Sequence, residues 1–94
     1  MEYNVNIHSE AVKYLNSLDP HTKQKIVEGL KVLGNLPVEG DVKKLKGTKG
    51  KRDLYRLRIG EYRAIYHVEN NNVYVLEIML RGKGYGWLDR LLIL

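Results

Sequence analysis

The sequence has no cysteine, no long apolar run and no basic start followed by an apolar stretch. In a chain of 94 residues, the absence of cysteine excludes disulfide scaffolds, thiolate metal sites and cysteine nucleophiles, and it suits a reducing compartment. The longest apolar runs have four residues, as at Leu91–Leu94, whereas a membrane-spanning helix needs about 20. Residues 1–7 alternate in polarity, unlike a secretion signal. We therefore expect a soluble, cytoplasmic protein that does not bind membranes.

The length and composition indicate a single domain spanning residues 1–94. Hydrophobic residues make up 44% of the chain and charged residues 29%, which is typical of a globular protein. A chain of this size buries only about 60–65% of the surface that its unfolded state exposes, so its stability is marginal and a bound partner would raise it.

The net charge of +5 is concentrated in the middle of the chain. Residues 43–63 carry nine basic residues against Asp53 and Glu61, a net charge of +7, so the remainder of the chain is slightly acidic. Because such a block repels itself, a phosphate backbone or an acidic protein is the expected ligand. The alternative is a lysine-rich loop exposed to water.

The N-terminal third predicts one strand followed by a helical hairpin. Tyr3, Val5 and Ile7 alternate with polar residues, as in a half-buried strand. Ser9 can cap a short helix, whose apolar stripe is Ala11, Val12, Leu15 and Leu18. Asp19-Pro20 then starts a second helix ending near Gly34, whose stripe is Ile26, Val27, Leu30 and Leu33.

The remainder predicts a loop and three strands. Residues 36–51 have scattered glycines and no sustained period, which indicates a basic connecting loop. Residues 54–59, 62–68 and 73–80 are rich in β-branched and aromatic residues, as in an antiparallel meander. The predicted fold class is α+β, with one curved sheet packed on the helices. The tail, residues 87–94, would either close over the core or dock a partner.

Turn lengths predict the register of the meander. A two-residue turn at Gly60-Glu61 sets Arg58 opposite Arg63. One face then carries apolar side chains for the core, namely Tyr55, Leu57, Ile59, Tyr62, Ala64 and Tyr66. At the second turn we expect a three-residue loop, which pairs Val68 with Tyr74, Tyr66 with Leu76, Ala64 with Ile78 and Tyr62 with Leu80. A two-residue turn would put Glu77 on the core face.

The polar face of the meander predicts a phosphate clamp. It carries Arg56, Arg58 and Arg63, with Arg81 expected opposite Glu61 at the same edge. Directly opposed like charges cost about 0.2–1 kcal/mol, whereas guanidinium groups match phosphate geometry. Alternatively, the arginines are solvated or reach Glu61 and Glu77.

The three histidines form no metal-ligand cluster in the sequence. His67 falls on the arginine face but four residues from Arg63, about 13 Å along a strand, so we expect it at the periphery of the site. His8 lies at a strand end and His21 in the first turn of a helix, and both are interpreted as surface residues.

Four segments in this order carry a family resemblance. They are Lys44-Leu45-Lys46-Gly47, Leu54-Tyr55-Arg56-Leu57-Arg58, Glu61-Tyr62-Arg63-Ala64-Ile65-Tyr66 and Arg81-Gly82-Lys83-Gly84-Tyr85. With the predicted order of elements, they make nearly the whole chain similar to the RelE/ParE superfamily of small toxins from toxin–antitoxin systems. The resemblance implies the RelE-like microbial ribonuclease fold.

For the RelE branch, the resemblance implies a ribosome-dependent endoribonuclease that cleaves mRNA in the ribosomal A site and halts translation. The ribose 2′-hydroxyl attacks the adjacent phosphate, without metal or cofactor. By position in the matching motifs, the implied catalytic residues are Arg56, Arg58, Arg63, Arg81 and Tyr85. The chain has only Lys83 between the two glycines before Tyr85, where the family is usually more basic, so the proton donor stays open. Tyr85 could instead be a loop aromatic packed on Trp87.

The resemblance also implies partners. We expect RNA and ribosome contacts from the basic residues Lys43, Lys44, Lys46, Lys49, Lys51, Arg52 and Lys83. A cognate RelB-like antitoxin would wrap the toxin in a hetero-oligomeric complex. Two alternatives remain: a ParE-like toxin that binds DNA gyrase without cleaving RNA, and a non-catalytic RNA-binding or regulatory module.

Overall fold

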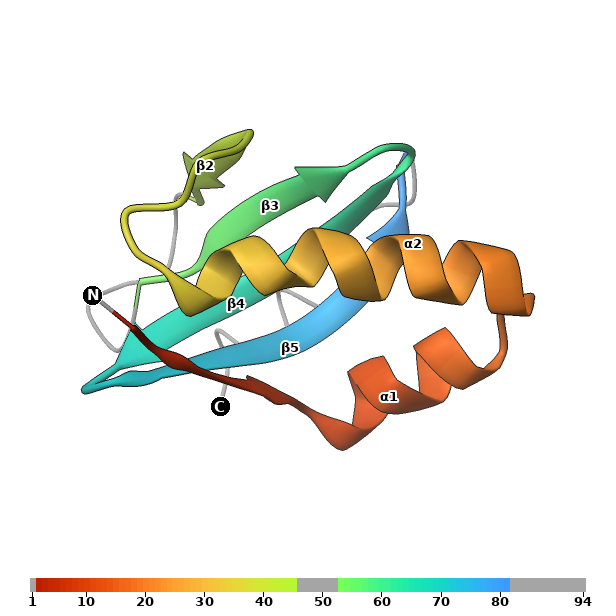
Figure 1. Cartoon of the computed structure of the whole chain (residues 1–94), viewed down its shortest axis with the longest axis horizontal. Coiled ribbons are helices and arrows are strands. Elements are labelled where there is room, and N and C mark those ends of the chain that lie inside the picture. The colour runs from red at the N-terminus through yellow and green to blue at the C-terminus, as the bar shows by residue number, and fades with distance from the viewer. Residues whose placement is uncertain (1, 46–52, 82–94) are drawn as a thin grey trace.

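The computed structural model describes residues 2–45 and 53–81 as two helices on one face of a five-stranded sheet (Figure 1). The order along the chain is β1 (Asn4–Ile7), α1 (Ser9–Asn16), α2 (Pro20–Leu30), a 3-10 turn η1 (Lys31–Gly34), β2 (Val42–Lys44), β3 (Tyr55–Ile59), β4 (Tyr62–Glu69) and β5 (Asn72–Leu80). The sheet order is β1-β5-β4-β3-β2, with β1 parallel to β5 and the other pairs antiparallel. The predicted α+β class and the helical pair are confirmed.

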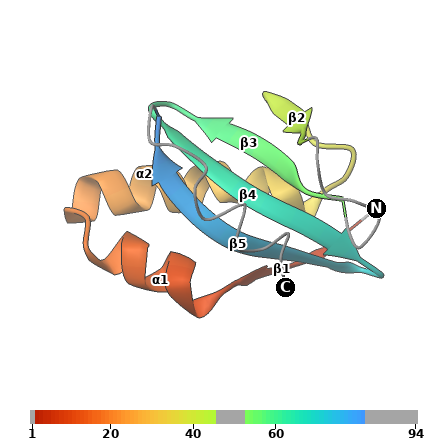
Figure 2. The ribbon, with the colours of Figure 1, turned by 180° about the vertical axis from the view of Figure 1, so that it is seen from behind.

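Seen from behind, the sheet has one face that neither α1 nor α2 covers, and this free face is defined for residues 2–45 and 53–81 only (Figure 2). The two helices pack their apolar sides on the opposite face. The arginines of the meander lie on the free face, because they alternate with the core residues of β3 and β4. None of the described helices is long and apolar enough to span a membrane.

Side chains at the helix starts fix where α1 and α2 begin. The Asp19 carboxylate accepts the backbone N–H of Thr22 at 3.0 Å, and Pro20 occupies the first helical position, as predicted. The hydroxyl of Thr22 donates to the other carboxylate oxygen at 2.7 Å, and this bond, followed by the backbone one, lowers the pKa of Asp19. At α1 the cap is His8, whose Nδ1 accepts the N–H of Glu10 at 3.3 Å, so the predicted cap at Ser9 is wrong by one residue.

The turn between β3 and β4 has the predicted two residues. Gly60 adopts a φ of 58°, which a glycine accommodates without strain. Arg58 therefore pairs with Arg63, Leu57 with Ala64 and Tyr55 with Tyr66. Every pair predicted for this hairpin is confirmed.

The turn between β4 and β5 differs from the prediction. It has two residues, with Asn70 at a φ of 56°, and Val68 pairs with Val73 rather than with Tyr74. Opposite Ile65 and Tyr66, a bulge in β5 at Leu76 then shifts the register by one residue. Beyond the bulge, Ala64 pairs with Ile78 and Tyr62 with Leu80, as predicted.

Because of the bulge, a two-residue turn does not put Glu77 on the core face. Val73 and Val75 before it and Ile78 after it all belong to the core under the helices. Leu76 packs in a cluster on the other face, and Glu77 lies opposite Ile65 of that cluster. The extra residue thus keeps Glu77 off the core face. The prediction from the sequence assumed strict alternation along the strand, which does not allow for an extra residue.

Part of the predicted loop at residues 36–51 is a strand. Val42–Lys44 forms β2, which pairs with β3 as the outermost strand of the sheet. Val42 is half-buried against the main core, whereas the two lysines are exposed. Three residues are too few to show a period in the sequence, so pairing with β3 decides their conformation.

The main core lies between the helices and the sheet. Its buried members include Ala11, Leu15, Ile26, Leu57 and Ala64, together with half-buried tyrosines of the meander. Val12 is 39% exposed, so it does not belong to the buried stripe of α1 as predicted. The predicted tail, residues 87–94, lies outside the described residues.

A second, smaller apolar cluster lies on the free face of the sheet. It consists of Leu54, Ile65 and Met79, with Leu45 and Leu76 packed against them. The alternation of arginines with core residues predicts a polar face, and this prediction does not include the cluster. The structure shows that the arginines stand beside buried apolar side chains, where their charges are less well screened than in open water.

Helix α2 lies close against the sheet at Gly29. A β-carbon added there would lie 2.6 Å from Cγ2 of Ile59, closer than such atoms come in proteins. We expect Gly29→Ala to lower the free energy of unfolding by about 1–3 kcal/mol, because the β-branched Ile59 cannot easily turn away. Urea denaturation measures this effect.

The Ile59→Ala background provides the control. With the clashing atoms removed, Gly29→Ala should raise stability by about 0.5–1 kcal/mol through helix propensity. If Gly29→Ala is equally destabilising in both backgrounds, close contact with Ile59 is not its cause.

Candidate nucleic-acid interface

The candidate site is the arginine face, defined as the free face of the sheet where Arg56, Arg58 and Arg63 lie. Arg56 and Arg58 are two residues apart on β3, so their side chains leave the sheet on the same side. Arg58 lies directly opposite Arg63 of β4. The register of one hairpin therefore brings these three cations together, as the sequence predicts.

Arg81 extends this face at the end of β5. Its backbone N–H donates to the carbonyl oxygen of Glu61 at 2.7 Å, which confirms the predicted placement. Met79 pairs with Arg63, and Arg81 lies two residues further along, on the same side by alternation. Its side chain is exposed.

An acidic residue that the sequence analysis missed lies between two of the arginines. Nη2 of Arg56 donates to Oδ1 of Asp41 at 2.9 Å, and Nη1 of Arg58 lies 3.9 Å from Oδ2 of the same carboxylate. Asp41 is held there because its carbonyl oxygen accepts the backbone N–H of Arg58 at 2.9 Å. Recognising β2 in the sequence would have aligned Asp41 with Arg58.

The counter-ions considered from the sequence were Glu61 and Glu77. Glu77 lies opposite Ile65, the residue two positions beyond Arg63 on β4, and so occupies a position diagonal to Arg63. Diagonal neighbours are within reach of long side chains. Glu77 thus contributes negative charge on the arginine face, alongside Asp41.

The two lysines of β2 that were predicted to bind RNA fall on different faces. Lys43 lies opposite Arg56 and so extends the arginine face. Lys44 lies opposite Tyr55, on the core side of the sheet, and its Nζ is 3.5 Å from Oδ2 of Asp53. Both remain exposed. The predicted site residues Lys46, Lys49, Lys51, Arg52, Lys83 and Tyr85 lie outside the described residues.

The histidines take structural positions. His67 is only 7% exposed and stacks on Tyr74 with a centroid distance of 5.0 Å. The sequence analysis placed it at the periphery of the site and did not predict that it is buried. His8 caps α1 and His21 is exposed. Within residues 2–45 and 53–81, no three His, Cys, Asp or Glu side chains are grouped so that they could hold a metal ion.

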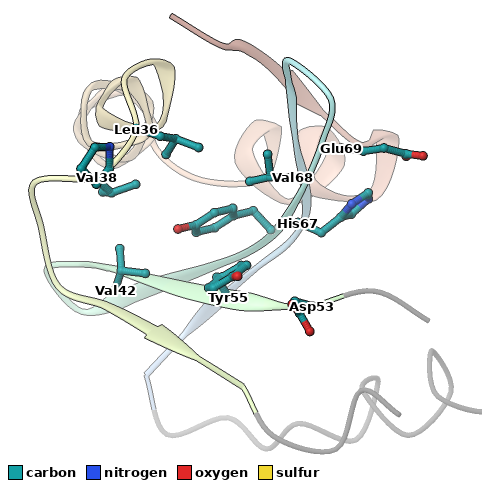
Figure 3. Close-up of a pocket in the computed structure, with 10 residues that line it drawn as sticks. Leu36, Val38, Val42, Asp53, Tyr55, His67, Val68 and Glu69 are labelled. Carbon is teal, nitrogen blue, oxygen red and sulfur yellow. The ribbon is translucent and has the colours of Figure 1, made fainter. Parts of the chain in front are cut away.

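A groove of about 760 Å³ lies near the start of β3, where residues 36–38 approach the sheet (Figure 3). Tyr55 and Tyr66 stack within it at a centroid distance of 5.5 Å, and Asp53 and Glu69 also line it. Besides these two carboxylates, its lining has His67 and mostly apolar residues but no arginine or lysine, so it is chemically distinct from the arginine face. The sequence analysis did not predict it.

Comparison with known proteins agrees with this geometry. Residues 5–85 match the model of the family described as the ParE toxin of type II toxin–antitoxin system, parDE. A curated protein of Methanocaldococcus jannaschii that carries the toxin name RelE1 is 35% identical over 68 residues, covering 72% of this chain and 76% of that one. The chain belongs to the RelE/ParE superfamily of type II toxins.

Solved structures support the same assignment for this RelE-like toxin. RelE in the RelE–RelB complex of Pyrococcus horikoshii is 38% identical, with a TM-score of 0.73 over 89% of this chain and 100% of that one. The isolated E. coli RelE toxin matches over 95% of both chains with a TM-score of 0.64 at 19% identity, which supports the fold alone. The predicted family and fold are both confirmed.

Burial in the groove changes the acidity of one tyrosine of the toxin. Desolvation, with a further contribution from Tyr55, raises the pKa of Tyr66 from 10.0 to about 12. Between these values the unfolded chain loses this proton while the folded chain keeps it, so stability falls as the pH rises through the window. Below pH 10 the contribution is fully present.

We expect Tyr66→Phe to remove this dependence. The free energy of unfolding of the wild type should fall by about 1 kcal/mol more than that of the variant between pH 9 and pH 11. Urea denaturation across this range measures both proteins, and their difference cancels the titration of all other groups. Parallel pH profiles would show that Tyr66 ionises equally in both states.

Proposed function

We propose that this toxin is a ribosome-dependent endoribonuclease that cleaves mRNA in the ribosomal A site. The observation that carries the proposal is the direct pairing of Arg58 with Arg63 on the free face of the sheet. Two guanidinium groups on one face can hold the same phosphate from two sides and remain charged at any physiological pH.

The chemistry that fits this face is attack by a ribose 2′-hydroxyl on the adjacent phosphorus. The new O–P bond closes a cyclic phosphate, and the bond to the 5′-oxygen of the next nucleotide breaks. A base takes the proton of the 2′-hydroxyl, and an acid protonates the leaving oxygen. Negative charge builds up on the phosphate oxygens in the transition state, where fixed cations stabilise it most. The reaction itself uses no metal or cofactor.

The arginines suit the electrostatic part of this reaction. Arg58 and Arg63 would hold the scissile phosphate, with Arg56 beside them and Arg81 at the edge of the face. Arginine stays protonated at any physiological pH, which makes it a good stabiliser of negative charge and a poor carrier of protons. Proton transfer is therefore assigned to another group, for which Tyr85 is our candidate.

The proposed reaction needs a substrate that is held in place, and the ribosome would hold it. On the arginine face, Arg56 and Arg63 are half-buried, whereas Arg58 and Arg81 are exposed. An in-line arrangement of the 2′-hydroxyl needs a fixed substrate, and mRNA held in the A site meets this requirement. The basic residues Lys43, Lys46, Lys49, Lys51, Arg52 and Lys83 would add attraction to ribosomal RNA. The protein would then act in the cytoplasm, where its substrate lies.

The positive charge of the arginine face also favours binding to an acidic protein partner. Relatives of this toxin have been solved as RelE–RelB complexes from P. horikoshii and as RelBE2 from Mycobacterium tuberculosis. We expect a RelB-like antitoxin to bind this chain in a hetero-oligomer and to place carboxylates on the arginine face. RNA and antitoxin would then compete for the toxin.

The second candidate function is that of a ParE-like gyrase poison. The matching family model bears the ParE description, which favours this alternative, and a gyrase poison needs no phosphate clamp. The opposed arginines favour the nuclease. A non-catalytic RNA-binding module is the third possibility, and in that case no single arginine would matter much.

Arg63→Ala tests the nuclease proposal. In a reconstituted translation reaction, primer extension should detect cuts within A-site codons for the wild type, only when ribosomes are present. We expect the variant to cleave at least about 100-fold more slowly than the wild type, because the contact that it loses strengthens in the transition state. Lys13→Ala on α1 is the control, since it also removes one cation, from an exposed side chain on the helix side.

Each outcome distinguishes the candidates. Intact mRNA with reduced gyrase activity would establish the ParE-like function. A modest, salt-dependent loss of RNA affinity without any cleavage by the wild type would indicate a simple RNA-binding module. Equal cleavage by Arg63→Ala and wild type would contradict the assigned role of Arg63.

A further inference from the structure

The contacts that Asp41 makes with its two neighbouring arginines differ in length. Its bond to Arg56 is short, at 2.9 Å, and the Arg56 side chain is only 12% exposed. Its contact with Arg58 is 3.9 Å, longer than a hydrogen bond, and the Arg58 side chain is 38% exposed. One carboxylate thus fixes a half-buried arginine and lies only loosely against an exposed one.

Arg56 depends on this carboxylate. Its Nε is buried and has no hydrogen-bond partner in the described part of the chain, whereas its Nη2 donates to Asp41, so this bond holds the guanidinium group. A buried guanidinium without a counter-ion is strongly unfavourable, and it would swing toward water if the carboxylate were removed. Asp41 therefore determines where the charge of Arg56 lies.

Arg58 is free to exchange its partner. Its guanidinium is exposed, and a phosphate could approach it from the solvent side while Asp41 stays bound to Arg56. Until then, the negative charge of Asp41 lowers the attraction of the face for anions. The same residue thus orders one arginine and weakens phosphate binding at its neighbour.

We propose that Asp41 is a positioning residue of the phosphate site. It holds Arg56 in place and acts as the resident anion that an RNA phosphate displaces from Arg58. This inference rests on the proposed function, because it assigns Asp41 a part in the same site. It predicts that removing the carboxylate tightens RNA binding and, when the hydrogen bond is lost as well, slows cleavage.

Two substitutions separate charge from hydrogen bonding. Asp41→Asn removes the charge and keeps an oxygen that can accept from Arg56, whereas Asp41→Ala removes both. Glu28→Gln on α2 is the matched control, since Glu28 is similarly exposed, at 56% against 54%, and also forms an ion pair, at 3.0 Å from Lys31. It lies on the helix side of the sheet, away from the arginine face.

Binding is measured by fluorescence anisotropy with a short, 2′-O-methylated RNA, which cannot be cleaved. We expect both Asp41 variants to bind about fivefold more tightly than the wild type at low salt, the effect of one charge at about 4 Å in water. Glu28→Gln should bind as the wild type does. A loss of structure would weaken binding, so tighter binding cannot arise from a merely structural role.

The effect of Asp41 on the position of the Arg56 side chain is measured in two ways. Side-chain NMR should show the Nε–Hε proton of Arg56 protected from exchange in the wild type and in Asp41→Asn, and exposed in Asp41→Ala. The rate of ribosome-dependent cleavage at saturating toxin should fall about 10- to 100-fold in Asp41→Ala and much less in Asp41→Asn. If Asp41→Ala does not fold, the isosteric Asp41→Asn still carries the binding test.

The inference is overturned if neither variant binds RNA more tightly, if Glu28→Gln tightens binding equally, or if Arg56 stays protected in Asp41→Ala. A wild type that cleaves mRNA while the Asp41 variants match the control would refute this inference alone. A wild type that neither binds nor cleaves RNA would refute the proposed function, and the NMR result would still report whether Asp41 positions Arg56.

Discussion

The pairing of β3 with β4 across the turn at Gly60-Glu61 decides which side chains of the meander face the helices and which form the arginine face. A shift of one residue would exchange the faces of every side chain in the hairpin. In the observed register, Leu57 and Ala64 face the helices while Arg58 and Arg63 stand opposed on the other side. Burial of the apolar side chains thus fixes the register, and the register places the charges.

The cost of this arrangement is electrostatic. Like charges face one another next to the buried cluster of Leu54, Ile65 and Met79, where screening by water is reduced. Asp41 offsets part of this cost, and an anionic ligand would offset more. A toxin with such a face gains stability whenever an acidic antitoxin or a phosphate backbone covers it. Inhibition and activity would then depend on the same few side chains.

Local signals in the sequence predict most of the fold and part of the site. The Asp19-Pro20 helix start and the Gly60 turn follow from rules about single residues, and the opposed arginines follow from that turn. The bulge in β5 and the strand β2 do not, because both arise from pairing with a neighbouring strand. Asp41 was missed for this reason: its role appears only once β2 is placed beside β3. The burial of His67 likewise depends on its stacking with Tyr74.

The most direct test of the central claim is a structure of this toxin on a ribosome whose A-site codon carries 2′-O-methyl groups, which prevent attack on the phosphate. We expect the phosphate that follows the modified ribose to lie on the free face of the sheet, within hydrogen-bond distance of both Arg58 and Arg63. RNA bound along the helices or the tyrosine-lined groove, with no phosphate between these two arginines, would contradict it.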